Sequence, residues 1–273
     1  MEGMKAIILA AGKGTRLRPL TYGIPKPLLP VKGKPMIDWV IRSIEGSVDE
    51  IIVAIPGTVG EDVHERTLSH IHGMSIDFYL KNAGYPVSVR TIPVPQKETA
   101  GDLRYILEET GINNGEILVV YGDNLTSFDV GEMVLYHRKA RKKLGVSSTV
   151  LLFEAPQNEL DRFGIAKVKS VEGFNLIENF VEKPKLSEAP SNLANGGYYI
   201  IEAEDVYEML PRHKTKVEHS LFPGLAKANK LCGFVTRLPH WIDISTVEAY
   251  ENANKMAYDG LIIPPPSKEE NEK

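Results

Sequence analysis

The stretch KAIILAAGKGTRLRPLT, residues 5–21, decides the fold of this chain, and PKPLLP at residues 25–30 continues it. Residues 6–11 form a short apolar run that stops at a glycine, which predicts a strand buried on both faces. Two glycines and four cations occupy the following loop and its continuation: Gly12, Gly14, Lys13, Arg16, Arg18 and Lys26. Glycine lets a backbone approach its ligand closely, and arginine and lysine bind phosphate oxygens. The stretch therefore predicts a buried strand followed by an anion-binding loop.

Two better-known phosphate-binding loops do not fit this stretch. A P-loop has four residues between its first glycine and a Gly-Lys-Ser/Thr sequence, and the order Gly12, Lys13, Gly14, Thr15 does not provide them. A dinucleotide-binding fingerprint has a third glycine where this chain has Leu17. Its loop also opens a helix, whereas this loop continues through prolines.

Composition and charge describe an ordinary globular chain of 273 residues, 42% hydrophobic and 25% charged. The net charge of −4 argues against a general nucleic-acid or membrane surface, so the loop cations indicate a small anionic ligand. The single cysteine, Cys232, excludes an internal disulfide and a thiolate metal cluster. The first apolar run is too short for a signal peptide, and no segment approaches the roughly 18 apolar residues that span a bilayer. We therefore expect a cytoplasmic protein.

Strands and helices alternate through the first half of the chain, which predicts a mostly parallel sheet. Strands are expected at residues 50–55, 76–80, 87–94, 116–121 and 147–153, and helices at 36–44, 61–72, 96–110 and 130–143. In the second helix, Val63, Leu68 and Ile71 are expected on one side, and the histidines His64, His70 and His72 are interpreted as solvated and not as a metal site. The second half predicts strands at 163–168, 176–182, 197–201 and 231–236, and helices at 205–210, 221–229 and 247–258.

Residues 9–21 together with residues 25–30 resemble the signature of the sugar-phosphate nucleotidylyltransferases, also called NDP-sugar pyrophosphorylases. The match runs in order over more than a dozen positions, so it is far more specific than a glycine triplet. The resemblance implies an α/β, Rossmann-like three-layer αβα nucleotidyltransferase fold with a mostly parallel mixed sheet. It implies a catalytic domain over residues 1–260. The three prolines at 264–266 and the charged residues after them predict a flexible, proline-rich, charged tail at residues 261–273. A homo-oligomer is expected from the same family.

Family members transfer a nucleoside monophosphate from a nucleoside triphosphate to a hexose 1-phosphate, which gives an NDP-sugar and pyrophosphate. This chemistry requires two anions held in line with their charge neutralised, because the sugar phosphate is already a nucleophile and pyrophosphate already a leaving group. The resemblance implies that Arg16 and Lys26 bind the triphosphate and that Lys183 binds the sugar phosphate.

Two aspartates are candidates for binding Mg²⁺. Asp123 follows the apolar run at residues 116–121, and ligands of open α/β sheets bind beyond the carboxyl ends of such strands. Asp123 and Asp243 resemble the family's pair of metal-binding aspartates, and carboxylate oxygens suit Mg²⁺. The family usually continues with Gly-Thr after the second aspartate, whereas this chain has Ser245 and Thr246. An alternative role for Asp243 is to cap the final helix.

The resemblance also implies contacts to the nucleotide and to the sugar. The nucleotide contacts are Ala10, Ala11, Gly12, Gly14, Thr15, Gln96, Thr99, Gly101 and Gly122, and the sugar contacts are Glu182, Asn195, Gly196 and Trp241. The family more often has glycine and alanine where this chain has Glu98 and Asp102. The Thr-Ala-Gly sequence at residues 99–101 favours the mannose-1-phosphate guanylyltransferase branch. The alternatives are a glucose-1-phosphate thymidylyl- or uridylyltransferase and, in another class, a non-catalytic regulatory subunit that binds nucleotide sugars.

Overall fold

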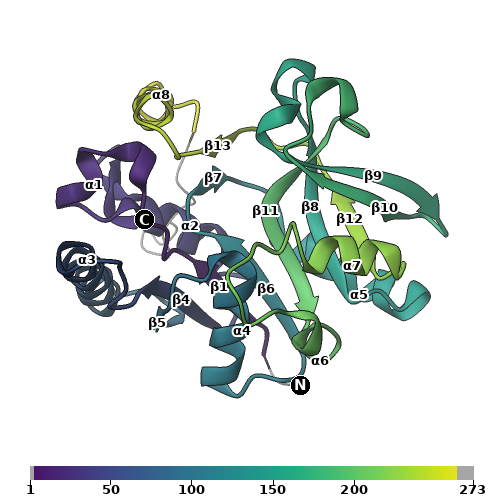
Figure 1. Cartoon of the computed structure of the whole chain (residues 1–273). Helices are drawn as coiled ribbons and strands as arrows, with labels where there is room; N and C mark the ends of the chain where they lie inside the picture. Colours follow the sequence, from purple (N-terminus) through teal and green to yellow (C-terminus); the bar gives the residue numbers. More distant parts are fainter. Residues whose placement is uncertain (1–2, 263–273) are drawn as a thin grey trace. The chain divides into compact units, whose positions relative to one another are not determined.

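The computed structural model describes residues 3–262 and divides the chain into two compact units (Figure 1). Of the described residues, unit 1 contains 3–96, 121–128 and 239–262, and unit 2 contains 97–120 and 129–238. The predicted α/β class is confirmed, with strands and helices in both units. None of the helices between residues 3 and 262 combines the length and the apolar character needed to cross a membrane. The predicted tail lies outside the described residues from residue 263 onward.

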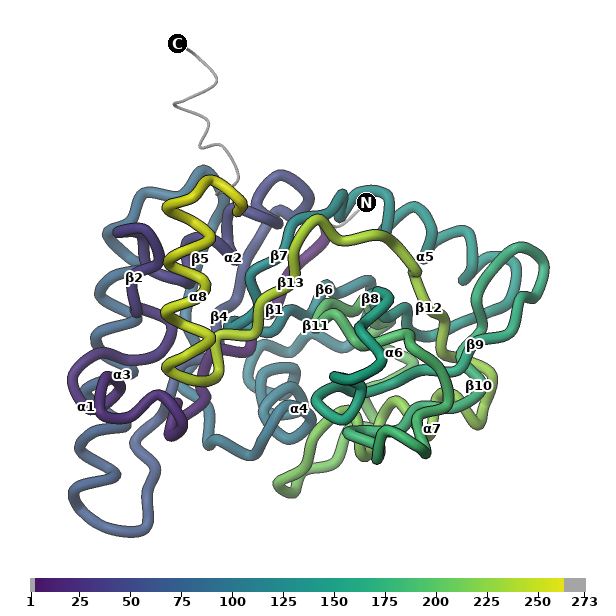
Figure 2. The backbone as a smooth tube through the Cα atoms, turned by 90° about the horizontal axis from the view of Figure 1, so that it is seen from above, coloured from purple at the N-terminus to yellow at the C-terminus, as the bar shows by residue number. Residues whose placement is uncertain are grey.

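Unit 1 is built on three parallel strands with buried apolar residues. These strands are β1 (Lys5–Leu9), β4 (Glu50–Pro56) and β5 (Ser88–Val94), in the order β5-β4-β1. The helices of the unit are α1 (Leu20–Gly23), α2 (Met36–Ile44), α3 (Val63–Asn82) and α8 (Val247–Tyr258). Two ribbons complete it, β2 (Pro30–Val31) with β3 (Lys34–Pro35) and β7 (Asn124–Thr126) with β13 (Trp241–Asp243). Helix α8 lies beside β2 (Figure 2), where the Tyr250 hydroxyl donates a hydrogen bond to Pro30 O at 2.8 Å.

Helix α3 corrects two predictions. The strand expected at residues 76–80 is wrong, because these residues form the last part of α3: Ile76 and Leu80 are buried on one helical face. The apolar residues expected on one side of this helix do not form its buried face, since Val63 is 70% exposed and Ile71 is 51% exposed. The buried face instead contains small and polar residues, among them Ser69, His72 and Gly73. Local hydrophobicity was a poor guide here because this helix packs closely on the sheet through small side chains.

Unit 2 contains a mixed six-stranded segment of sheet. Its strands are β6 (Glu116–Tyr121), β8 (Ser148–Glu154), β9 (Gly164–Val171), β10 (Phe174–Glu182), β11 (Leu193–Glu202) and β12 (Leu231–Val235). They follow the order β6-β11-β8-β12-β10-β9, with β8 and β12 parallel and the other pairs antiparallel. Strand β11 begins earlier than predicted, and its register shifts between Asn195 and Tyr199, where Gly197 has a φ of +78°. The predicted sugar-contact residues Asn195 and Gly196, which precede the predicted strand, therefore lie within a bulged strand.

The helices of unit 2 are α4 (Glu98–Thr110), α5 (Val130–Leu144), α6 (Ala203–Val206) and α7 (Leu221–Lys227). Helix α5 begins at the Asp129 cap, whose side chain accepts a hydrogen bond from Glu132 N, and ends at Gly145 in the left-handed conformation. Helix α4 ends in the same way at Gly111. These local signals explain why the helices predicted at 96–110 and 130–143 agree closely with α4 and α5, whereas the helix predicted at 205–210 has other bounds in α6.

Candidate active site

The β7–β13 ribbon of unit 1 brings the two predicted metal-binding aspartates together. Its antiparallel register sets Asp243 opposite Asn124, and Ile244 N donates a hydrogen bond to Asp123 O at 3.1 Å. Burial raises the pKa of Asp243, and the negative charge of Asp123 raises it further. The two carboxylates therefore repel one another, which is how a pair of acidic groups behaves when both face one small site.

Two predicted cations act on the same pair. Lys26 Nζ lies 2.5 Å from Asp123 Oδ2, and the Lys26 side chain is only 10% exposed. Lys26 and the exposed Arg16 both act electrostatically to lower the pKa of Asp243, opposing the effect of burial. Arg16 belongs to the 3-10 turn Thr15–Leu17 and Lys26 to the turn Lys26–Leu28. Four charged residues that the sequence analysis singled out are thus neighbours within unit 1.

The Asp123–Asp243 pair fits a divalent cation. Both carboxylates supply the hard oxygen ligands that Mg²⁺ prefers, and their mutual repulsion is what such a cation would relieve. Ser245, where the family usually has glycine, is buried and its side chain hydrogen-bonds Asp243. The helix-capping role considered for Asp243 belongs to Thr246, whose side chain accepts a hydrogen bond from Ala249 N at 3.1 Å.

The loop at residues 12–18, called the signature loop below, exposes its backbone at one glycine. A Cβ added to Gly12 would meet no atom within 4 Å, so a ligand has room beside this backbone. Gly14 has a φ of +62°, and its carbonyl accepts a hydrogen bond from the Thr21 hydroxyl at 2.9 Å. A Cβ on Gly122 would lie 2.9 Å from Ala10 Cβ, so this glycine is required for packing against the end of β1. The chain is therefore tightly packed where Gly122 contacts Ala10, before the loop, and open to a ligand at Gly12.

The other predicted nucleotide contacts of unit 1 surround this loop. Ala10 and Ala11 are buried directly after β1, and Thr15 is exposed at the loop's 3-10 turn. Gln96 Nε2 donates a hydrogen bond to Ala11 O at 2.7 Å and so ties the end of β5 to the loop. Trp241, the predicted sugar contact of unit 1, lies on β13 opposite Thr126.

Thr99 and Gly101, predicted as nucleotide contacts, pack against the segment at residues 213–217 of unit 2. Thr99 Oγ1 accepts a hydrogen bond from Val217 N at 3.0 Å. A Cβ on Gly101 would lie 2.8 Å from His213 O, so the glycine is required here by packing. Asp102, which the sequence analysis noted only as a departure from the family, accepts a hydrogen bond from Lys97 N at 2.7 Å. The nucleotide-binding roles of Thr99 and Gly101 stay predictions.

The predicted sugar-contact residues of unit 2 lie on neighbouring strands. Strand β9 pairs with β10 at Glu182 and with β11 beside Asn195. Glu182 forms an ion pair with Lys216 at 3.5 Å, and Asn195 Nδ2 donates to Glu218 Oε1 at 3.4 Å. The sequence analysis missed both Lys216 and Glu218, because only the tertiary structure brings their segment to these strands. The predicted roles of these sugar-contact residues are not tested by these contacts.

Two further positions in this group have backbone features of their own. Lys183 is exposed, has a φ of +49°, and its N–H donates to Phe163 O at 2.9 Å. A Cβ on Gly196 would lie 2.7 Å from Leu151 Cδ2. Steric crowding therefore explains why the chain has glycine at this buried position.

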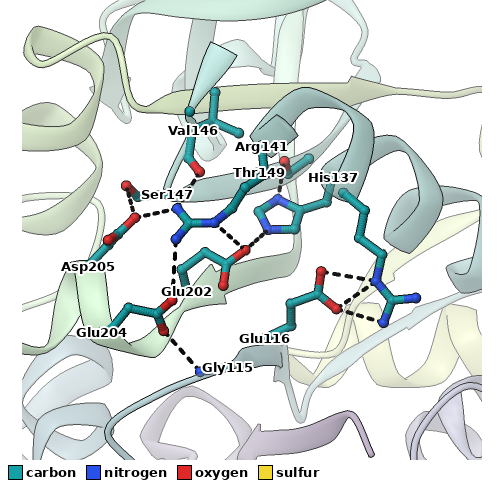
Figure 3. Close-up of polar contacts among 12 residues, drawn as sticks. Gly115, Glu116, His137, Arg141, Val146, Ser147, Thr149, Glu202, Glu204 and Asp205 are labelled. Atoms are coloured by element: carbon teal, nitrogen blue, oxygen red, sulfur yellow. Dashed lines mark hydrogen bonds and ion pairs between the residues drawn. The ribbon is translucent and has the colours of Figure 1, made fainter. Parts of the chain in front are cut away.

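A second group of possible metal ligands lies elsewhere in unit 2, where Glu116, His137 and Glu202 offer atoms within 4.8 Å of one another (Figure 3). His137 Nε2 lies 3.1 Å from Glu202 Oε1, and its Nδ1 lies 2.8 Å from Thr149 Oγ1. Glu202 also pairs with Arg141 at 2.9 Å. Glu116 is bound by the guanidinium of Arg138. Because protein partners already engage these groups, the cluster is a network that links α5, β8 and β11.

Known proteins resemble this chain over almost its whole length. Residues 5–259 match the family described as nucleotidyl transferase. The probable mannose-1-phosphate guanylyltransferase 2 of Arabidopsis thaliana is 30% identical over 268 residues, which cover 97% of this chain and 68% of that protein. The UTP–glucose-1-phosphate uridylyltransferase of Synechocystis sp. is 28% identical over 251 residues, which cover 92% of this chain and 62% of that protein.

A solved structure also shares the fold. It is assigned as a glucose-1-phosphate thymidylyltransferase of Bacillus anthracis and superposes with a TM-score of 0.75. The sequences are 24% identical, and the match covers 94% of this chain and 96% of that one.

Proposed function

Because the chain belongs to the sugar-phosphate nucleotidylyltransferase family of enzymes, we propose that it transfers GMP from GTP to mannose 1-phosphate and releases pyrophosphate. The Arabidopsis relative supports this choice of base and sugar, as does the Thr-Ala-Gly sequence at residues 99–101. The Synechocystis relative supports a second candidate pair, UTP and glucose 1-phosphate.

The observation that carries the proposal is the charge cluster of Arg16, Lys26, Asp123 and Asp243 in unit 1. Arg16 is exposed in the same loop as Gly12, whose backbone is open, so both are available to triphosphate oxygens. Lys26 is anchored on Asp123, which places its ammonium group where negative charge gathers during transfer. Asp123 and Asp243 would hold Mg²⁺, which when bound neutralises charge on phosphate oxygens.

The reaction proceeds by attack of a sugar-phosphate oxygen on the α-phosphorus of the nucleotide. The bond from this phosphorus to the oxygen that bridges to the β-phosphate breaks, and pyrophosphate leaves with that electron pair. The protein supplies position and charge and needs no nucleophile of its own. Lys183, exposed after β10, is proposed to bind the incoming sugar phosphate.

Pyrophosphate release in the presence of Mg²⁺ tests this function. GTP, UTP, dTTP, CTP and ATP are each combined with mannose 1-phosphate and with glucose 1-phosphate, and GTP with mannose 1-phosphate should be the fastest pair. Asp123→Asn should lower the rate about 100-fold or more, because it removes charge from the cluster. Asp259→Asn, the same change at an exposed residue after α8, is the matched control and should retain the rate. Binding of nucleotide sugar without pyrophosphate release from any pair would favour the regulatory-subunit alternative.

A further inference from the structure

A pocket in unit 1 lies where β1, β4 and β5 reach their carboxyl ends. Its lining includes Gly12 of the signature loop, Pro56 at the end of β4 and Gln96 after β5, with Leu68 and His72 from α3. The space outside the atoms is about 350 Å³, part of it open to solvent. Ligands of open α/β sheets bind at this edge. Lys13, Arg18, Glu65 and Ser69 complete the lining, so most of its side chains are charged or polar, and Pro56 and Leu68 supply its apolar surface.

Two buried polar atoms of this lining have no hydrogen-bond partner among the described residues: His72 Nε2 and Gln96 Oε1. His72 is 7% exposed, although the sequence analysis interpreted it as solvated, so that prediction is wrong. Because Gln96 Nε2 donates to Ala11 O, the orientation of the amide is set and Oε1 is left as a hydrogen-bond acceptor. Native proteins rarely leave such atoms unpaired, so the two atoms indicate a ligand with matching donors.

The backbone holds His72 at this position through close contacts. A Cβ on the next residue, Gly73, would lie 2.2 Å from Pro56 O, so only glycine allows α3 to approach the end of β4 this closely. Ser69, one turn earlier, donates a hydrogen bond to Gly57 O at 2.7 Å. Gln96 has a φ of +54°, a conformation that a non-glycine residue adopts at a cost and that is concentrated at functional sites. Burial also lowers the pKa of His72, which makes a neutral ring that can accept a hydrogen bond at pH 7.

We propose that His72 is a specificity-determining residue that, together with Gln96, selects guanine. In this arrangement His72 Nε2 accepts a hydrogen bond from the 2-amino group of the base, and Gln96 Oε1 accepts one from its N1–H. On the Watson–Crick edge, guanine alone among the five common bases presents two adjacent hydrogen-bond donors. Each of the other four bases presents a single donor there, next to an acceptor. Leu68 and Pro56 supply apolar surface for the ring. The inference rests on the proposed nucleotidyl transfer and names a residue that reads its base.

Comparing GTP with inosine triphosphate tests this role, because inosine lacks only the 2-amino group. Calorimetric titration of the full chain, without sugar phosphate, should show GTP binding about tenfold more tightly than inosine triphosphate. His72→Leu should weaken GTP binding to the level of inosine triphosphate and change the latter little. His70→Leu is the matched control, since His70 is an exposed residue of the same helix and is not part of the pocket lining. His72→Gln, which keeps an acceptor, should restore part of the preference.

Each outcome decides a separate point. Equal binding of the two nucleotides by the wild-type chain, or an unchanged preference in folded His72→Leu, would overturn the role of His72. If His72→Leu does not fold, the wild-type ratio and the His72→Gln variant still decide. A preference for UTP or dTTP would overturn the selection of guanine while leaving nucleotidyl transfer in place. Guanine-selective binding without pyrophosphate release would instead contradict the proposed function and leave this inference intact.

Discussion

Replacing Asp102 with asparagine measures what the chain loses by burying a carboxylate at the start of α4. Asp102 is 6% exposed, and its Oδ1 accepts a hydrogen bond from Lys97 N. Burial is the main cause that raises the pKa of Asp102 from 3.8 to about 6. The charge of Glu98 also raises it, whereas the Lys97 N–H and the Lys97 charge oppose the shift. Asparagine keeps the shape and the acceptor oxygen but carries no charge.

The sign of the effect follows from proton binding. Because the pKa of Asp102 is higher in the folded than in the unfolded chain, the folded chain binds more protons between about pH 4 and about pH 6. The free energy of unfolding therefore falls as pH rises through this window. Above it, the ionised carboxylate costs roughly 3 kcal/mol, at about 1.4 kcal/mol for each pH unit between the two pKa values. Asp102→Asn should be more stable than the wild-type chain by about this amount at pH 8.

Urea unfolding of both proteins from pH 4 to pH 8 checks this prediction. The difference between their free energies of unfolding should grow between about pH 4 and about pH 6 and then level off, because titrations common to both proteins cancel. A difference that stays the same at all pH values would refute the reasoning, since it would mean that burial does not perturb this carboxylate. A variant less stable at pH 8 would show that the charge strengthens the Lys97 contact more than burial penalises it.

Two further predictions concern stability and are checked by urea unfolding at neutral pH. Arg141→Met should lower the free energy of unfolding by about 3 kcal/mol, because its guanidinium is a cation shared by three carboxylates, which would lose it together. Lys143→Met on the same helix removes one exposed pair at 3.8 Å and should cost about 0.5 kcal/mol or less; equal losses in the two variants would contradict the account of the network. Gly101→Ala should cost about 2 kcal/mol, because its Cβ would lie 2.8 Å from His213 O. Gly46→Ala, with no atom within 4 Å of the added Cβ, should change little, and equal effects at the two glycines would contradict the packing argument.

Elements defined by local signals could be predicted closely from the sequence. Strand β6 and helix α8 have the predicted bounds, because a buried apolar run and a helical period with a threonine cap are local properties. The candidate site also follows in part from local sequence. The glycines and cations of residues 12–18 form one continuous loop, so their proximity needs no tertiary information.

Other features depend on what each segment packs against. Asp123 and Asp243 meet only because β7 pairs with β13, and nothing in the sequence of either short strand specifies that partner. The buried face of α3 is set by its approach to β4 at Gly73, which turns His72 inward and leaves Val63 exposed. The sequence by itself therefore determined the glycine- and cation-rich loop at residues 12–18 and most of the regular elements, because these follow from the periodicity and the turn residues of each segment. Only the tertiary structure decided which carboxylates pair and which polar atoms are buried without partners, because these depend on contacts between segments far apart in the chain.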